Sequence, residues 1–175
     1  MHFTTEHRFP GAPEQVAALM IDPTFEAAVA LPDLKAPDVL EHVAPSPTSD
    51  AGSLRLRYEY IGELDGLARR VTAGRKLTLV QFVGFDTAAG PGRYTLEAEA
   101  DPGRVHGAAT ITLTPDGAEC VRRFDGDFVV KLPIMGGTIE KRLLPGILSR
   151  FDVEAEALAD RLRTGRAGNA PERAD

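Results

Sequence analysis

Apolar and polar residues alternate along much of the chain before Leu132, which is the pattern of β-strands. The clearest case is Leu54–Ile61, where leucines and tyrosines alternate with charged residues. A period of two places successive side chains on opposite faces, so this pattern predicts a sheet with one buried face and one solvent-exposed face. Leu77–Phe85, in contrast, is apolar on both faces. The predicted strands are His2–Phe9, Val39–Ala44, Leu54–Ile61, Leu77–Phe85, Tyr94–Asp101, Val105–Thr114 and Ala118–Leu132.

The stretch Thr138–Arg163 has a helical period instead. Its apolar side chains recur three or four residues apart and form one broad stripe, with polar residues on the other side. Pro145 lacks an N–H and clashes with the preceding turn, which kinks or breaks a helix. The apolar phase nevertheless runs through it, because Leu143, Ile147 and Phe151 are four apart. We therefore expect one long, kinked helix.

The remaining segments are short. Apolar spacing predicts one short helix around Val16–Met20 and a second after Asp22, where Pro23 opens it. Glu63–Thr72 has helical spacing and predicts a short helix or a lid. Short turns with Gly, Pro and Asp join the later strands, which indicates an antiparallel meander.

Together these elements predict one α+β domain over residues 1–163. Its architecture is a curved antiparallel sheet of seven strands wrapped around the long C-terminal helix, with two short helices between the first two strands. Residues 164–175 contain no large apolar residue and are predicted to be disordered.

Small residues recur on the predicted inner face of the sheet, and they suggest unfilled volume beneath the long helix. Because protein interiors are normally close-packed, such volume either collapses or is kept for a ligand. Glycines in strands also mark bulges that bend a sheet, and both interpretations can hold together. The small residues are Ala98, Ala100, Gly107, Ala109 and Gly126.

The order of the elements resembles the START-like superfamily (SRPBCC), whose architecture is called the helix-grip fold. The stretches HFTTEHRFPGAPEQVAALMIDPTFEAAVA and VVKLPIMGGTIEKRLL resemble a mainly actinobacterial group of domains in that superfamily, to which no reaction is assigned. The most specific piece is the Pro-x-x-Gly-Gly-x-x-Glu run over Pro133–Glu140. The resemblance covers roughly Met1–Arg163. It implies a hydrophobic pocket between sheet and helix and transfers no catalytic residues.

The composition limits the kinds of partner that the protein is expected to bind. The net charge of −6 and the pI near 5.3 argue against nucleic acid, whose phosphates would be repelled. The lack of an apolar run of membrane-spanning length argues against membrane insertion, and with the absence of a signal-like N-terminus it predicts a cytoplasmic protein. The lone Cys120 excludes an internal disulfide and is expected to be a small buried residue. A monomer or a homodimer is expected.

Two residues are candidates for acid/base chemistry. Glu140 falls within the apolar stripe of the long helix, where a carboxylate can orient a ligand or transfer a proton; the alternative is that it serves the start of the helix. His7 shares the inner face of the first strand with Phe3 and Phe9, either as a polar group in the pocket or as a satisfied histidine of the core or rim.

The other polar residues are weaker candidates for ligand binding or catalysis. The hydroxyls of the three tyrosines are candidates for hydrogen bonds to a ligand, with ordinary sheet packing as the alternative. His2, His42 and His106 have no partner at metal-ligand spacing, and Ser149 lacks a nucleophile elbow. The pairs Arg69-Arg70 and Arg122-Arg123 are expected to be solvated charge.

The sequence thus favours the binding or carriage of a small hydrophobic ligand, lipid or polyketide-like. The alternatives are a polyketide cyclase/dehydrase-like enzyme that uses acid/base residues in the same cavity, and an interaction role for the outer helix surface. No catalytic residue, metal or cofactor is predicted. The predicted ligand-binding residues are His7, Leu56, Tyr58, Tyr60, Tyr94, Leu96, Ala98, Ala109, Ile111, Phe124, Phe128, Glu140, Leu143, Ile147 and Phe151.

Overall fold

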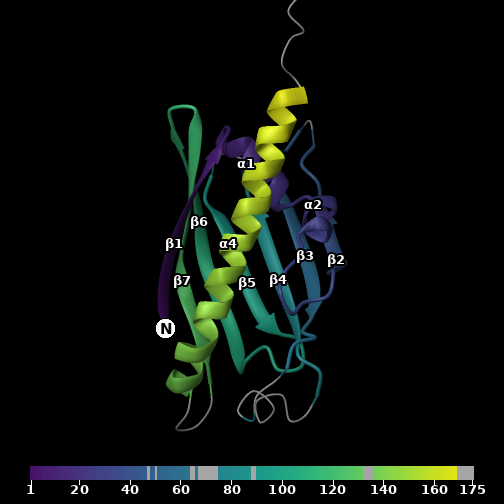
Figure 1. Ribbon diagram of the computed structural model, residues 1–175, viewed down its shortest axis with the longest axis vertical. Helices are drawn as coiled ribbons and strands as arrows, with labels where there is room; N and C mark the ends of the chain where they lie inside the picture. Colours follow the sequence, from purple (N-terminus) through teal and green to yellow (C-terminus); the bar gives the residue numbers. More distant parts are fainter. Residues whose placement is uncertain are drawn as a thin grey trace, which may run out of the picture.

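The computed structural model describes residues 1–46, 48–49, 51–63, 66, 75–87, 90–131 and 136–168, and its framework is one antiparallel sheet of seven strands (Figure 1). The predicted strands are all present and differ from the observed ones only at their ends. The strands are β1 His2–Pro10, β2 Asp38–Val43, β3 Gly52–Glu59, β4 Thr78–Phe85, β5 Gly92–Ala98, β6 Val105–Asp116 and β7 Glu119–Val130.

The strand order is β1-β7-β6-β5-β4-β3-β2, so the predicted meander from β2 to β7 is confirmed. The first strand closes the series by pairing antiparallel with the last one, which leaves β1 and β2 at the two edges. The chain therefore brings its first strand and the start of its last helix to the same side of the molecule (Figure 1).

Three helices of the described residues accompany the sheet: α1 Pro13–Met20, α2 Pro23–Ala28 and α4 Gly136–Gly168. Proline opens both short helices, and the side chain of Asp22 caps α2 by accepting a hydrogen bond from the backbone N–H of Thr24 at 2.8 Å. The long helix α4 crosses the sheet along its length (Figure 1). The predicted α+β helix-grip architecture is confirmed.

The long helix is continuous through Pro145, as the unbroken apolar phase predicts. It extends to Gly168, so the expected start of disorder at Thr164 is wrong for residues 164–168. The hydroxyl of Thr164 donates to the carbonyl oxygens of Asp160 and Arg161, which ties this residue to the preceding turn. The predicted helix or lid over Glu63–Thr72 lies outside the described residues except at its start and at residue 66, and so do Arg69 and Arg70.

One face of the sheet and one face of α4 form the core. The alternation seen in the sequence is repeated in burial: β7, for example, buries every second residue from Cys120 to Val130. The buried side chains of α4, among them Phe151 and Leu158, meet this inner face. The single cysteine is buried, as expected.

The two inner glycines of β6 and β7 are not bulges. The pairing of β6 with its neighbours runs without a register shift through Gly107, and that of β7 does so through Gly126. A Cβ on Gly126 would lie 2.2 Å from the carbonyl oxygen of Ala108, whereas one on Gly107 would make ordinary contacts. Glycine at position 126 is therefore required for the close approach of β6 and β7.

Candidate ligand site between the sheet and helix α4

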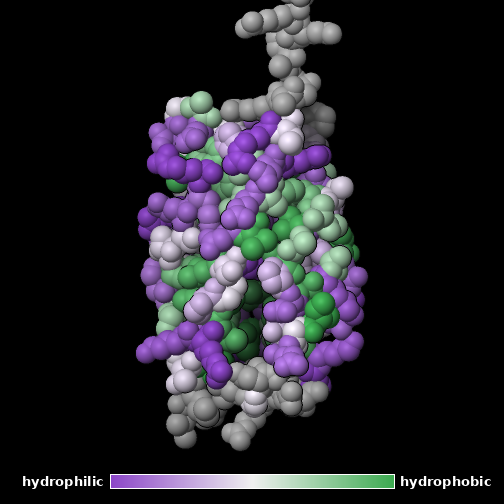
Figure 2. Space-filling model, in the orientation of Figure 1, coloured by the Kyte–Doolittle hydropathy of each residue, from purple (hydrophilic) through white to green (hydrophobic). Residues whose placement is uncertain are grey.

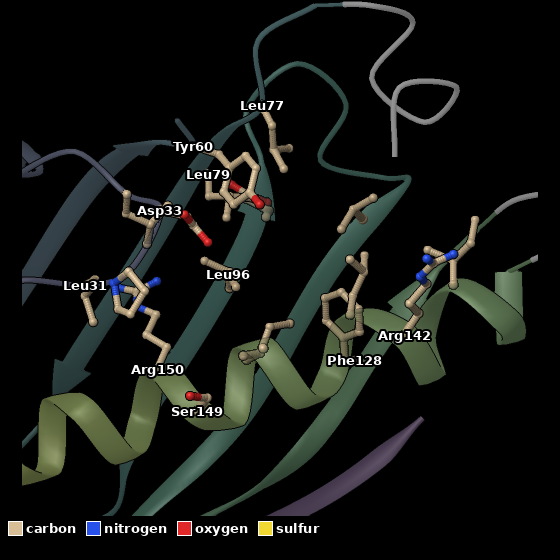
Figure 3. Close-up of a pocket in the computed structure, with 18 of the residues that line it drawn as sticks. Leu31, Asp33, Tyr60, Leu77, Leu79, Leu96, Phe128, Arg142, Ser149 and Arg150 are labelled. Carbon is tan, nitrogen blue, oxygen red and sulfur yellow. The ribbon is translucent and has the colours of Figure 1, made fainter. Parts of the chain in front are cut away.

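A cavity of about 550 Å³ lies between α4 and the sheet. Figure 2 shows it as a hollow with largely hydrophobic walls in the lower half of the molecule, beside the helix. Its walls come from α4, from strands β4, β5, β6 and β7, and from the segment before β2 (Figure 3). The lining residues are Leu31, Pro32, Asp33, Leu34, Tyr60, Glu63, Leu77, Leu79, Leu96, Glu97, Val105, Phe128, Ile139, Arg142, Leu143, Gly146, Ile147, Ser149 and Arg150.

The cavity has the dimensions and chemistry of a small-molecule site. Its volume lies within the range of about 300–1,000 Å³ that is usual for ligand pockets. Its deep walls are aliphatic or aromatic, for example Leu96 and Phe128, and both of these residues are buried. The acidic lining residues, Asp33, Glu63 and Glu97, are exposed or half-buried and lie at the rim.

Five of the residues predicted to bind ligand line this cavity. Leu96 and Phe128 come from neighbouring positions across β5, β6 and β7, since both face Gly107 of β6. Tyr60 follows β3 and pairs with Leu34 in an isolated bridge, which brings the segment before β2 to the cavity. Leu143 and Ile147 lie four apart on α4.

The predicted aromatic residues Tyr94, Phe124 and Phe151 pack on one another instead. The rings of Phe124 and Phe151 stack with centroids 4.4 Å apart, and the ring of Tyr94 meets Phe151 edge-on at 5.2 Å. These rings fill the space between the sheet and α4, so they belong to the packed core and do not line the cavity.

The other predicted apolar residues also lie outside the cavity lining. Leu56, Tyr58 and Ile111 are fully buried in the core, and Ala109 is half-buried against it. Ala98 borders a separate, much smaller pocket of about 40 Å³ near the β5–β6 turn. The sequence showed that these residues face inward but did not show where along the helix the space is left open.

Glu140 joins the start of α4 to the sheet and to the first residue. Its Oε1 accepts a hydrogen bond from the backbone N–H of Val130 at 2.9 Å, and its Oε2 lies 3.2 Å from the N-terminal ammonium of Met1. The hydrogen bond from Val130 and the charge of Met1 lower the pKa of Glu140. These contacts agree with the structural alternative for this residue, and it does not line the cavity.

His7 belongs to a different cluster. Its Nε2 lies 2.9 Å from the carboxylate of Asp152, and its Nδ1 lies 3.4 Å from the guanidinium of Arg122. It does not line the cavity either. The acid/base pair proposed from the sequence, Glu140 with His7, is therefore not assembled in the cavity.

The interpretation of Arg122 as solvated charge is wrong. Its side chain is 0% exposed, and its Nη1 donates to Oε1 of Glu154 at 2.5 Å. The guanidinium also lies over the rings of Phe9 and Phe124, with centroids 5.1 and 4.9 Å away. Residue 122 shares the inward phase of Phe124 on β7, which is why it is buried; its neighbour Arg123 points outward and is exposed.

A second buried polar cluster, which the sequence analysis missed, borders the cavity. The hydroxyl of Tyr58 donates to Oε2 of Glu26 at 3.0 Å, and Nη2 of Arg150 donates to Oε1 of Gln81 at 2.6 Å. The guanidinium of Arg150 lies 4.1 Å from the centre of the Tyr58 ring. Burial, and then the charge of Glu154, raise the pKa of Glu26 to about 8, so the surroundings of this carboxyl favour its protonated form.

The helical period contained a signal for two of these buried charges. Advancing about 100° per residue from Ile139 places Arg150 near 20° and Glu154 near 60°, inside the apolar stripe. No comparable signal marks Glu26, whose burial depends on how the short helix α2 meets β3.

The sheet wrapped around α4, with a cavity between the two, is a helix-grip fold. The chain itself belongs to a family described as proteins of unknown function (DUF2505), which matches residues 4–162.

Solved structures share this fold at low sequence identity. A protein of Thermus thermophilus, TTHA0849, is 16% identical with a TM-score of 0.65, over 97% of this chain and 100% of that one. The Zhui aromatase/cyclase of Streptomyces sp. R1128 is 14% identical with a TM-score of 0.63, over 97% and 98%. A START superfamily protein of Mycobacterium smegmatis is 18% identical with a TM-score of 0.54, over 94% and 99%. At such identities the likeness shows the fold alone, and no curated protein matches the sequence.

Two further observations concern partners. Among the described helices, none combines the length and apolar character needed to cross a membrane. Within the same part of the chain, no three His, Cys, Asp or Glu side chains are grouped as metal ligands.

Proposed function

We propose that this protein binds and carries a small hydrophobic molecule, lipid or polyketide-like, in the cavity between α4 and the sheet. The observation that supports the proposal is the cavity itself: about 550 Å³ with a largely apolar lining, in a domain whose remaining core is tightly packed. The fold adds support, because aromatase/cyclase and START superfamily proteins are among the solved structures that share it.

A cavity-filling substitution tests the proposal directly. Gly146 of α4 lines the cavity, and a Cβ placed there meets nothing within 4 Å, so Gly146→Phe can enter the open space without a clash. Phenylalanine also favours a helix more than glycine does. We expect the variant to fold and to lose at least about ten-fold in affinity for any apolar ligand that the wild type binds, because removing buried contact area of this size costs more than about 1.4 kcal/mol.

The measurements are native mass spectrometry of freshly purified protein and thermal shifts across a panel of lipids and aromatic polyketide-like compounds. Gly137→Phe is the matched control, since Gly137 also lies on α4 with open space at its Cβ but does not line the cavity. Wild-type protein that is always empty and shifted by no compound would refute the proposal, as would equal binding by the two phenylalanine variants and the wild type.

The cyclase/dehydrase-like alternative has no comparable support. It needed two polar groups, from among Glu140, His7 and the tyrosines, to converge in the cavity, and Glu140 and His7 are engaged elsewhere by the backbone of Val130 and by Asp152.

A further inference from the structure

One charged side chain is buried in the wall of the largely apolar cavity. Arg150 of α4 lines the cavity and is only 8% exposed. Figure 3 shows it rising from the helix at the end of the pocket where Leu31 lies, while Phe128 and Arg142 lie at the opposite end. A guanidinium in such a place is costly unless something compensates it.

Two contacts hold the guanidinium of Arg150 in one orientation. Its Nη2 donates to Gln81 at 2.6 Å, and its central carbon lies over the ring of Tyr58, 4.1 Å from the ring centre. Neither contact is an ion pair, because an amide oxygen and an aromatic ring are neutral. The protein therefore positions this group without a hydrogen-bonded ion pair among the described residues, although the charges of Glu26 and Glu154 act on it.

The remaining donors of Arg150 have no partner. Its Nε and Nη1 are buried and form no hydrogen bond with any residue of the described ranges. Buried polar atoms are nearly always hydrogen-bonded, so unpaired donors in a side chain that lines a cavity require an explanation. A guanidinium is the planar donor group that suits the oxygens of a carboxylate.

The charges around Arg150 leave a positive excess. The other buried guanidinium, Arg122, is paired with Glu154. Glu26 is the remaining buried carboxyl among the described residues, and burial raises its pKa, which disfavours its charged form. Two buried guanidiniums therefore face one paired carboxylate and one carboxyl whose ionisation is disfavoured, and this balance favours the entry of an anion. The charged residues elsewhere in the lining, such as Asp33 and Arg142, are exposed.

We propose that the ligand of this cavity is an apolar molecule with an anionic oxygen group, such as a carboxylate, and that the guanidinium of Arg150 binds that group while the apolar walls hold the rest. The inference rests on the proposed function, because it names the chemical class of the molecule that occupies the same cavity. It explains why an arginine stands in a wall made otherwise of apolar residues.

Pairs of ligands that share an apolar body but differ in charge separate the anionic-ligand inference from simple hydrophobic binding. The affinities of dodecanoate and dodecanol, and of naphthoate and naphthalenemethanol, are measured by calorimetry at neutral pH. The first pair represents a lipid and the second an aromatic compound. Because hydrogen bonds to charged groups discriminate strongly, we expect the acid of at least one pair to bind about ten- to a hundred-fold more tightly than its alcohol.

Three variants test the assignment to Arg150. Arg150→Met keeps a long side chain without the charge, and we expect it to bind the acid no better than the alcohol. Arg150→Lys keeps the charge but not the planar pair of donors, so it should retain part of the preference. Lys141→Met, the matched control, removes a positive charge from an exposed position of the same helix that does not line the cavity, and it should leave the preference unchanged.

Each outcome bears on the anionic-ligand inference, on the proposed hydrophobic binding, or on both. Equal affinities of acid and alcohol for the wild type would overturn the anionic-ligand inference and leave hydrophobic binding intact. Binding of none of the four compounds would count against both. A preference for the acid that survives in Arg150→Met would show that another group binds the anion. Should Arg150→Met fail to fold, the wild-type comparison and Arg150→Lys still test the inference.

Discussion

The two halves of helix α4 face the same sheet but meet it differently. The half from Phe151 to Leu162, here called the packed half, fills the space beneath it with stacked aromatic rings and buried leucine. The half from Ile139 to Arg150, the open half, borders the cavity. Helix α1 contacts α4, β6 and β7, so it helps to cover the packed half.

This difference shows how one fold combines stability with a binding site. The packed half has close contacts and a buried ion pair between Arg122 and Glu154, which holds the helix on the sheet. The open half gives up contacts and keeps a positioned but unpaired guanidinium, Arg150. Functional sites commonly lack the dense packing that the rest of a protein uses for stability.

Matched leucine substitutions should reveal the difference most strongly. Leu158 in the packed half is 0% exposed, and Leu158→Ala should lower the free energy of unfolding by about 3 kcal/mol, because it leaves a cavity in close-packed surroundings. Leu143 in the open half is 37% exposed and already borders the cavity, so Leu143→Ala should cost less than about 1 kcal/mol. Urea unfolding measures both; equal costs would contradict the distinction between the halves.

The pH dependence of stability should report Glu26, which lies where the two halves meet. Its pKa is about 8 in the folded protein against 4.5 for the free side chain, so between these values the folded state keeps a proton that the unfolded state loses. Its contribution to stability is therefore complete below pH 4.5 and falls as the pH rises, by about 1.4 kcal/mol for each pH unit until about pH 8.

The control for this prediction is Glu26→Gln, which keeps an oxygen to accept the hydrogen bond of Tyr58 but does not titrate. Urea midpoints of the two proteins should diverge with rising pH, the wild type losing stability relative to the variant. Parallel curves would show that Glu26 is not held protonated by its surroundings.

The smallest expected effect concerns the rim of the open half. Asp33 points into the pocket on the side of Arg150 (Figure 3), and its negative charge should oppose an anionic ligand. Asp33→Asn should therefore strengthen dodecanoate binding about two-fold and leave dodecanol unchanged. Asn suits the backbone there, whose φ of 58° is left-handed. Weaker dodecanoate binding by the variant, measured by calorimetry, would contradict this electrostatic picture.

A third of the residues that the sequence predicted to bind ligand line the cavity, and the extent of the cavity was not visible in the sequence. Alternation correctly assigned inward faces to Leu96 and Phe128, and the helical period did so for Ile147. The same rules also selected Phe124 and Phe151, which fill the core instead of lining the cavity. Periodicity shows which face a residue takes, and it contains no information on how far apart the two facing surfaces are.

The sequence by itself determined the seven strands, the long helix that continues through Pro145 and the identity of the inward face, because these follow from periods of two and about 3.6 residues along the chain. Only the tertiary structure decided which part of the helix–sheet interface stays open and which charges are buried. Those outcomes depend on contacts between residues distant in the chain, such as Arg150 with Gln81 and Tyr58 with Glu26, and local patterns do not encode such contacts.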